Sequence, residues 1–350
     1  MTVKELAKLC GVSPGTVSNV LNGKNNVSDA TRKKILEIVE ETDYHPNYFA
    51  SSIRKKETQI IGIITEDLNQ FTTPPVVDAL TERIESKGYH TVLMNMRIYS
   101  RLKQNEWNRS EKISGFLQPI LRELQSIKVD GIVYVGAHDR ELTVFPDNHT
   151  IPTVVTYATS KGDRFISVNI ADEDGGYDMT KYLMSMGHTR IGVITGAGNN
   201  RHSINRLQGY KKALNEVGIR FDPELIEEGD WTMESGYVAG KILDKGVTAI
   251  WAMNDDMAAG VYRVLEERGL KAGKDISVAG FDDRFGNRYL IPSITTDELP
   301  LTEMGIKSAE MILKAVSGEQ PEQRHFLIPC KMKIRESVTE NKQTRRSPAI

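Results

Sequence analysis

Hydrophobic residues follow two different patterns along the chain, and the change comes near residue 59. Before it, apolar residues recur at helical spacing in three short stretches, each behind a residue that can cap a helix. After it, short apolar runs alternate with segments of helical character. The sequence therefore predicts a small helical domain followed by a larger α/β core.

The first two predicted helices have well-defined starts. Thr2 and Glu5 have the spacing of a capping box, and Ser13 can cap a helix whose first residue is Pro14. Gly11 lies between the two helices and permits a sharp turn. The spacing is that of a helix-turn-helix.

A third helix is expected after Ser28, which can cap it, and it should end at the polar residues 43–47. Three small helices packed as an ordinary bundle would give the same periodicity. Pattern alone therefore leaves both interpretations open.

The order of residues in this segment resembles the DNA-binding headpiece of the LacI/GalR (lactose/galactose/purine repressor) family. The resemblance is carried by VKELAKLCGVS at residues 3–13, Thr16-Val17-Ser18, Leu21-Asn22-Gly23, Val27-Ser28, Thr31-Arg32 and Tyr44-His45-Pro46-Asn47. It implies binding to double-stranded operator DNA through the second helix and the following linker. We expect DNA contacts from Thr2, Ser13, Pro14, Gly15, Thr16, Ser18, Asn19, Asn22, Ala50, Ile53 and Arg54.

Asn19 stands where many members of that family carry arginine. Arginine prefers guanine, whereas asparagine can pair with adenine. We therefore expect the operator to differ at that base, with a binding preference of about 1–3 kcal/mol. Pro14 and Gly15 offer no side-chain hydrogen bonds. Readout from that turn would be apolar, or through the backbone and phosphates.

Residues 47–58 form the expected hinge helix, which is too short to be stable alone in water. The resemblance implies that two copies pair in a homodimer over the minor groove, with Ile53 wedged between base steps. Arg54 and the two lysines after it would contact phosphates. A flexible basic tether is the alternative interpretation.

The core contains seven apolar runs that predict buried strands of parallel sheets: Ile60–Ile64, Thr91–Met94, Ile132–Val135, Thr153–Val155, Ile191–Ile194, Ala249–Ala252 and Ser277–Ala279. Ile61–Thr65 and Ile191–Thr195 are alike at an offset of 130, which indicates a duplicated lobe. The next strands match at an offset of 118, so the first lobe should carry about 12 extra residues within 96–128. A surface insertion is the default interpretation of that segment, and a lid or partner surface using Trp107 is the alternative.

The resemblance extends over about residues 2–338 and implies an α/β core of two Rossmann-like parallel-sheet lobes, similar to periplasmic binding proteins, behind the three-helix headpiece. We expect a helix-turn-helix domain at 1–46, the hinge at 47–58, the two-lobed core at 59–340 and a polar tail at 341–350. The first lobe should comprise about 59–157 plus 292–320, and the second about 158–291 plus 321–340. The chain would cross back to the first lobe near Pro292.

Ligands of such sheets bind beyond the C-terminal ends of the strands. From this rule and from the family's effector pocket we expect an effector to contact Phe71, Tyr157, Arg206, Trp231, Asn254 and Asp282. An indole face can cover the apolar face of a sugar while Arg, Asn and Asp bond its hydroxyls. Structural alternatives are a loop brace for Asp282, a salt bridge for Arg206 and packing for Trp231.

Two departures from the family pattern leave the effector's identity open. Tyr157 replaces an aspartate that sugar-responsive members often carry, and the segment Asn199–His202 before Arg206 is unusual.

Composition narrows the remaining choices. The net charge of −2 divides into +2 for residues 1–60, with nine basic and seven acidic side chains, and −4 for the rest. Nucleic-acid binding must therefore depend on where the charges lie. The two cysteines, Cys10 and Cys330, are expected to be free thiols in a reducing compartment.

No signal segment, membrane-spanning run or catalytic motif is apparent, so we predict a cytoplasmic protein that is not an enzyme and needs no cofactor or metal. The predicted function is a dimeric transcription regulator, in particular a repressor, controlled by a small-molecule effector. The alternatives are a cytosolic sugar- or nucleoside-processing enzyme, or a solute receptor without DNA binding, on the same core.

Overall fold

The structure, a computed structural model, describes residues 1–21, 23–44, 58–103, 106–107, 109–160, 162, 164–319 and 321–341. The chain divides into two compact units, Met1–Gln59 and Ile60–Ile350. Nearly all of the expected hinge and tail lies outside the described residues, as do Asn22, Ala50, Ile53 and Arg54. The wedge and phosphate contacts of the hinge therefore stay predictions.

The first unit contains the three expected helices, α1 (Val3–Cys10), α2 (Pro14–Leu21) and α3 (Asp29–Glu41). Thr2 and Glu5 form the predicted capping box, with the Thr2 N–H donating to the Glu5 carboxylate at 2.7 Å. The Ser13 hydroxyl accepts from the Thr16 N–H at 3.1 Å. Gly11 has φ 68°, in the left-handed region where glycine is favoured. These local bonds fix the helix starts that the sequence predicted.

One small core holds the first unit together. Its buried apolar residues come from all three helices and the segment after α3: Leu6, Ala7, Cys10, Val17, Val20, Ile35 and Tyr44.

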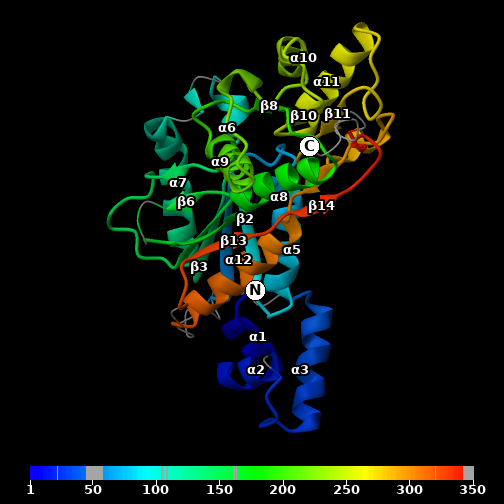
Figure 1. The fold of residues 1–350 in the computed structure, drawn as a ribbon. Helices are drawn as coiled ribbons and strands as arrows, with labels where there is room; N and C mark the ends of the chain where they lie inside the picture. Colours follow the sequence, from blue (N-terminus) through cyan, green and yellow to red (C-terminus); the bar gives the residue numbers. More distant parts are fainter. Residues whose placement is uncertain are drawn as a thin grey trace. The chain divides into compact units, whose positions relative to one another are not determined.

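Two parallel sheets form the second unit (Figure 1). The first has the order β13-β7-β5-β3-β1-β2 and consists of β1 (Ile60–Thr65), β2 (His90–Asn95), β3 (Gly131–Val135), β5 (Thr153–Thr156), β7 (Ile166–Ile170) and β13 (His325–Ile328). The second has the order β11-β10-β8-β9 and consists of β8 (Ile191–Thr195), β9 (Ile226–Glu228), β10 (Ala249–Ala252) and β11 (Ser277–Ala279). All seven predicted strands are confirmed.

Helices cover both faces of the first sheet. Ile61 and Ile63 of β1 join the core on one side, whereas Ile60 and Ile64 join the core on the other. The first side is covered by α5 (Thr73–Glu85) and α12 (Leu301–Val316), which pack against each other. On the second side lies α7 (Ser110–Ile127), whose Leu124 belongs to that core. Burial on both faces explains why the strand sequences are continuously apolar.

The second sheet is accompanied by α8 (Asp172–Ser185), α9 (Arg201–Glu216), α10 (Ala239–Leu243) and α11 (Asp255–Glu267). Short elements complete the unit: β4 (Glu141–Leu142) pairs with β6 (Thr159–Ser160), and β12 (Thr296–Glu298) pairs antiparallel with β14 (Lys331–Lys333). The 3₁₀ turns are η2 (Pro223–Leu225), η3 (Glu234–Val238) and η4 (Phe285–Tyr289).

The expected lobe limits need correction. Strands β7 and β13 pair with each other and β7 pairs with β5, so both belong to the first sheet. The ranges 158–291 and 321–340 that we expected for the second lobe therefore contain two strands of the first. The buried strand β7 lies between β5 and β13, so its backbone groups have hydrogen-bond partners on both edges. The expected return near Pro292 does add α12 to the first lobe, whereas β12 pairs with β14 and bridges to Asp282 after β11.

The segment 96–128, which carries the extra residues of the first lobe, contains α6 (Ile98–Arg101) and α7. The Trp107 indole N–H donates to the Leu102 carbonyl at 3.1 Å, and its ring meets Tyr99 edge-on at 4.2 Å. This half-buried tryptophan packs within its own lobe, which favours the surface insertion over a partner surface.

Both cysteines are free, as expected; Cys10 is buried and Cys330 is half-buried. Within the described ranges, no helix has the length and apolar character needed to cross a bilayer.

Helices α8 and α9 pack backbone to backbone. A Cβ on Gly209 of α9 would lie 2.0 Å from the Glu173 carbonyl oxygen, and one on Gly176 of α8 would lie 2.3 Å from the Arg206 carbonyl oxygen. Only glycine fits at these two positions, and the contact fixes where Asp172 and Arg206 lie.

We expect Gly209→Ala to lower the free energy of unfolding by about 1–3 kcal/mol, because the methyl group forces the helices apart. Urea unfolding monitored by circular dichroism measures this change. Gly115→Ala in α7 is the matched control: its Cβ meets nothing within 4 Å, so alanine should stabilise by about 0.5–1 kcal/mol. Equal effects of the two substitutions would contradict the packing argument.

Candidate functional site

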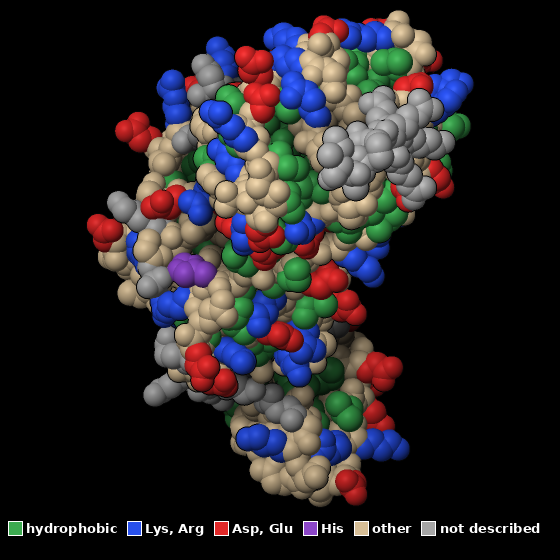
Figure 2. Space-filling model, in the orientation of Figure 1, with side chains coloured by type: hydrophobic (Ala, Val, Ile, Leu, Met, Phe, Trp, Pro, Cys, Tyr) green, Lys and Arg blue, Asp and Glu red, His purple; other side chains and the backbone are tan. Residues whose placement is uncertain are grey.

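The DNA-facing candidates of the first unit lie at its surface. Ser13, Pro14 and Gly15 are exposed, and the other described candidates of α2, Thr16, Ser18 and Asn19, are half-buried. The exposed Thr2 caps α1. Acidic and basic side chains are intermixed on the visible face of the molecule (Figure 2), which agrees with the weak net charge. DNA contact by these residues stays a prediction.

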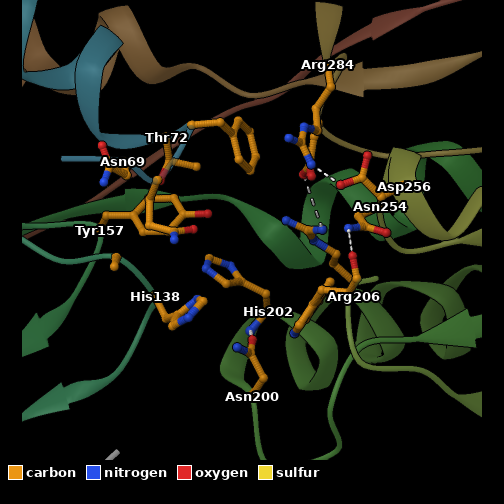
Figure 3. A pocket seen from close by; sticks show the side chains of 15 residues that line it. Asn69, Thr72, His138, Tyr157, Asn200, His202, Arg206, Asn254, Asp256 and Arg284 are labelled. Carbon is orange, nitrogen blue, oxygen red and sulfur yellow. Dashed lines mark hydrogen bonds and ion pairs between the residues drawn. The ribbon is translucent and has the colours of Figure 1, made fainter. Parts of the chain in front are cut away.

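A cleft of about 370 Å³ lies between the two sheets of the second unit (Figure 3). Its lining comes from segments that follow β1, β3 and β5 of the first sheet and β8, β10 and β11 of the second, together with the loop after β9. All six expected effector residues line it: Phe71, Tyr157, Arg206, Trp231, Asn254 and Asp282. The structure brings them together, although effector contact itself stays a prediction.

Nine further residues line the cleft: Asn69, Gln70, Thr72, Ala137, His138, Asn200, His202, Asp256 and Arg284. Asn200 and His202 belong to the unusual segment Asn199–His202, whereas the other seven were not singled out from the sequence as effector contacts. Of these seven, Asn69, Gln70 and Thr72 follow β1, Asp256 follows β10 and Arg284 follows β11, as the strand-end rule leads one to expect. Ala137 and His138 follow β3, so the same strand-end rule would have found them.

Arg206 is buried in the cleft wall and is also a salt-bridge partner. Its Nε donates to one Asp172 oxygen at 2.7 Å, and its Nη1 lies 3.9 Å from Asp282. The guanidinium also lies 3.6 Å from the centre of the Phe281 ring. The structural and ligand-binding interpretations of Arg206 are therefore compatible.

Asp172 is shared between two cationic or potentially cationic groups. Its second oxygen lies 2.6 Å from Nδ1 of His202. Burial by itself would raise the pKa of Asp172, but His202 and Arg206 together lower it below its ordinary value. Tyr157 lies against the same imidazole, with ring centres 5.0 Å apart. The two departures from the family pattern, Tyr157 and the Asn199–His202 segment, thus meet in one place.

Trp231 is held at the cleft by a glycine and an amide. A Cβ on Gly196 would lie 1.9 Å from the indole, so glycine makes room for the ring. Asn254 donates from Nδ2 to the Trp231 carbonyl at 2.9 Å, while its Oδ1 accepts from the Met257 N–H and caps α11. Asn254 therefore positions Trp231 in addition to lining the cleft.

Three of the cleft residues have a strained backbone. Tyr157, Trp231 and Asp282 have φ of 55°, 75° and 112°, in a backbone region that residues other than glycine rarely adopt. Each such residue costs about 1–3 kcal/mol, and such residues cluster at binding sites. Half of the six expected effector residues carry this signature.

Arg284 closes the opposite end of the cleft from His202 (Figure 3). Its guanidinium pairs with Asp256 and lies 4.6 Å from the centre of the Phe71 ring. Because Phe71 belongs to the first lobe, this contact crosses the cleft.

Three aspartates near the cleft, Asp255, Asp283 and Asp297, are buried. The Asp283 carboxylate forms two salt bridges: its Oδ2 lies 2.7 Å from Nη2 of Arg288, and its Oδ1 lies 2.6 Å from Nη2 of Arg335. Burial raises the pKa of Asp255 and of Asp297 to about 7. Asp297 is 2% exposed, and its Oδ2 has no hydrogen-bond partner in the described part of the chain.

Comparison with known proteins identifies relatives of both units. Residues 2–47 match the bacterial regulatory proteins of the lacI family, and residues 180–338 match a periplasmic binding protein-like domain. The HTH-type transcriptional repressor PurR of Vibrio atlanticus (strain LGP32) is 32% identical over 335 residues, which cover 93% of this chain and 95% of the relative. The HTH-type transcriptional regulator DegA of Bacillus subtilis (strain 168) is 29% identical over 345 residues, 97% and 98% of the two chains.

Solved structures agree with this relationship. A lac repressor dimer bound to operator and the anti-inducer ONPF superposes with a TM-score of 0.80 at 26% identity, covering 97% of this chain and 99% of the other. A complex of the transcriptional regulator CelR with cellobiose has a TM-score of 0.66 at 28% identity, covering 96% and 99%. All four of these proteins are named as transcription regulators or repressors and not as enzymes.

The raised pKa of Asp297 predicts a pH-dependent stability. The pKa of an aspartate in an unfolded chain is about 3.9. In the native state the pKa of Asp297 is about 7, so the folded protein binds the carboxyl proton more tightly than the unfolded chain does. The stabilisation is complete below about pH 4 and is lost as the pH rises through about 7. We expect Asp297→Asn to reduce the fall in unfolding free energy between pH 5 and pH 8, measured by urea denaturation. The exposed Asp275→Asn is the control, and an unaltered pH slope in Asp297→Asn would refute the assignment.

Proposed function

Because the chain belongs to the lacI family of bacterial regulatory proteins and is a DNA-binding transcription regulator, we propose that it is a repressor controlled by an uncharged sugar in the cleft between its lobes. The observation that carries the proposal is the meeting of Arg206, Trp231 and Asp282 in one cleft.

The charges of the cleft favour an uncharged ligand. Arg206 is paired with Asp172, and Arg284 is paired with Asp256. Burial, with the positive charge of Arg140, lowers the pKa of His138 to about 3, so this imidazole is neutral at physiological pH. Each arginine that lines the cleft among the described residues thus has a carboxylate neighbour. A phosphate or carboxylate would lose its hydration there without gaining an unpaired cation.

The remaining chemistry suits a polyhydroxylated ring. The Trp231 indole offers an aromatic face at the edge of a polar lining, and Asp282 offers oxygens that accept from hydroxyl groups. The relative solved with cellobiose supports a sugar, and the two departures at Tyr157 and Asn199–His202 argue that the preferred sugar differs from that of other members.

Regulation would follow from the two lobes. We expect effector binding to change the angle between the lobes, to move the first lobe against its dimer partner, and to order or melt the paired hinge helices. A coupling of about 1–3 kcal/mol between the sites is enough for regulation. The same proposal includes a cytoplasmic location.

A homodimer is supported by exposed apolar side chains in both lobes. Strand β2 is an edge of the first sheet, and its Leu93 is 42% exposed. An edge strand with apolar residues is a ready surface for pairing. On the second lobe, Phe285 and Tyr289 are each 70% exposed and Ile291 is 92% exposed. The solved lac repressor on operator is a dimer.

The effector assignment is tested by a thermal-shift screen of the full chain against monosaccharides, disaccharides, sugar phosphates and nucleobases. We expect an uncharged sugar to raise the melting temperature more than its phosphorylated counterpart does. Trp231→Ala should weaken the binding of that sugar about 30-fold, because an aromatic anchor contributes about 2 kcal/mol to the binding free energy. Trp107→Ala, a half-buried tryptophan outside the cleft, is the matched control. Preferential binding of a sugar phosphate or a nucleobase would refute the uncharged sugar.

The operator preference is tested by selection from random duplexes. We expect Asn19→Arg to shift the preferred base at one position from adenine to guanine, because arginine bonds guanine O6 and N7. Asn19→Ala should lower affinity without a new preference. A selection profile that is the same for Asn19 and Arg at this position would show that the side chain does not read a base.

A further inference from the structure

We propose that Asp139 of the first lobe and Arg201 and His202 of the second form a clasp that holds the cleft closed and thereby sets effector affinity. The closure follows from the contacts alone, whereas the consequence for the effector rests on the proposed function.

Asp139 is anchored in the first lobe. It lies between β3 and β4, is 6% exposed, and accepts from the Thr159 hydroxyl at 2.9 Å through Oδ1. Its other oxygen, Oδ2, accepts from Nε of Arg201 at 3.2 Å. Arg201 is the first residue of α9, which belongs to the second lobe. The Asp139 carboxylate therefore joins the two lobes.

A second bond runs in parallel. The Asp139 backbone N–H donates to Nε2 of His202 at 3.3 Å. A nitrogen that accepts carries no proton, so Nδ1 bears the imidazole hydrogen and donates it to Asp172. The tautomer of His202 is thus set by one bond within its own side of the cleft and one bond across it.

Only one of the three clasp residues lines the cleft. Neither Asp139 nor Arg201 is among the lining residues, whereas His202 is. His202 shares Asp172 with Arg206, and its ring lies against Tyr157. Asp139 would accordingly be a positioning residue: it orders His202, and through Asp172 it orders Arg206, only while the lobes are together.

Opening would separate these groups. The Asp139 carboxylate would keep Thr159 but lose its charged partner, and His202 would lose its bond at Nε2. A ligand that needs both walls binds only the closed fraction, so its apparent affinity falls in proportion to that fraction. The unusual segment Asn199–His202 would then matter for the closing equilibrium as well as for ligand shape.

Amide hydrogen exchange of the unliganded full chain tests the clasp directly, because the bond to His202 protects the Asp139 N–H across the cleft. We expect Arg201→Gln to speed exchange at residue 139 by up to about fivefold, the effect of a half-exposed ion pair. Arg201→Lys, which keeps the charge, should restore part of the protection. Lys212→Ala is the control on the same helix. It removes an ion pair between Lys212 of α9 and Glu173 of α8, and this pair does not cross the cleft.

The second readout is affinity for the sugar found in the thermal-shift screen. Arg201→Gln should weaken its binding by a factor similar to the change in exchange, and Asp139→Asn should do the same. Exchange at residue 139 that matches wild type in both variants would overturn the clasp. Faster exchange with unchanged sugar affinity would overturn its control of the effector. If no sugar binds the wild type, the proposed effector fails, while the exchange result still decides whether the clasp exists.

Discussion

The carboxylate of Asp172 is the group on which the arrangement of the cleft depends. It is buried, and it is ionised because Arg206 and His202 lie against its two oxygens at 2.7 and 2.6 Å. Removing one partner of such a buried pair leaves an uncompensated charge, at a cost of about 3–5 kcal/mol. The glycine contact between α8 and α9 brings these groups to this distance. Packing of two helices thus fixes the electrostatics of the ligand wall.

Local chemistry explains why much of the fold could be predicted. The capping box of Thr2 and Glu5 and the Ser13 cap are contacts within three residues, so sequence spacing alone contains them. Strands buried on both faces are equally visible, as continuous apolar runs. The strand-end rule then located most of the cleft, because the C-terminal ends of parallel strands meet at one edge of a sheet.

The remaining features depend on tertiary contacts between distant residues. Which sheet β7 and β13 join is decided by hydrogen bonds to strands far along the chain, and an apolar run does not encode its partner. The bond between Asp139 and His202 spans 63 positions and exists only where the lobes meet. Similarly, the pKa values of Asp255 and Asp297 are raised because of burial, which no local motif reports.

The cleft also shows why structural and ligand-binding roles need not compete. Arg206 braces Asp172 and still faces the cavity, and Asn254 caps α11 while it holds the strained Trp231 backbone. A ligand shifts a conformational equilibrium only through contacts that differ between its states. Residues that are fixed within one lobe make the same contacts whether the lobes are open or closed. The groups whose contacts would change are those that meet across the cleft, which include Arg284 with Phe71 at one end and Asp139 with Arg201 at the other. Control of this regulator should therefore lie at the two ends of the cleft, while recognition lies in its walls.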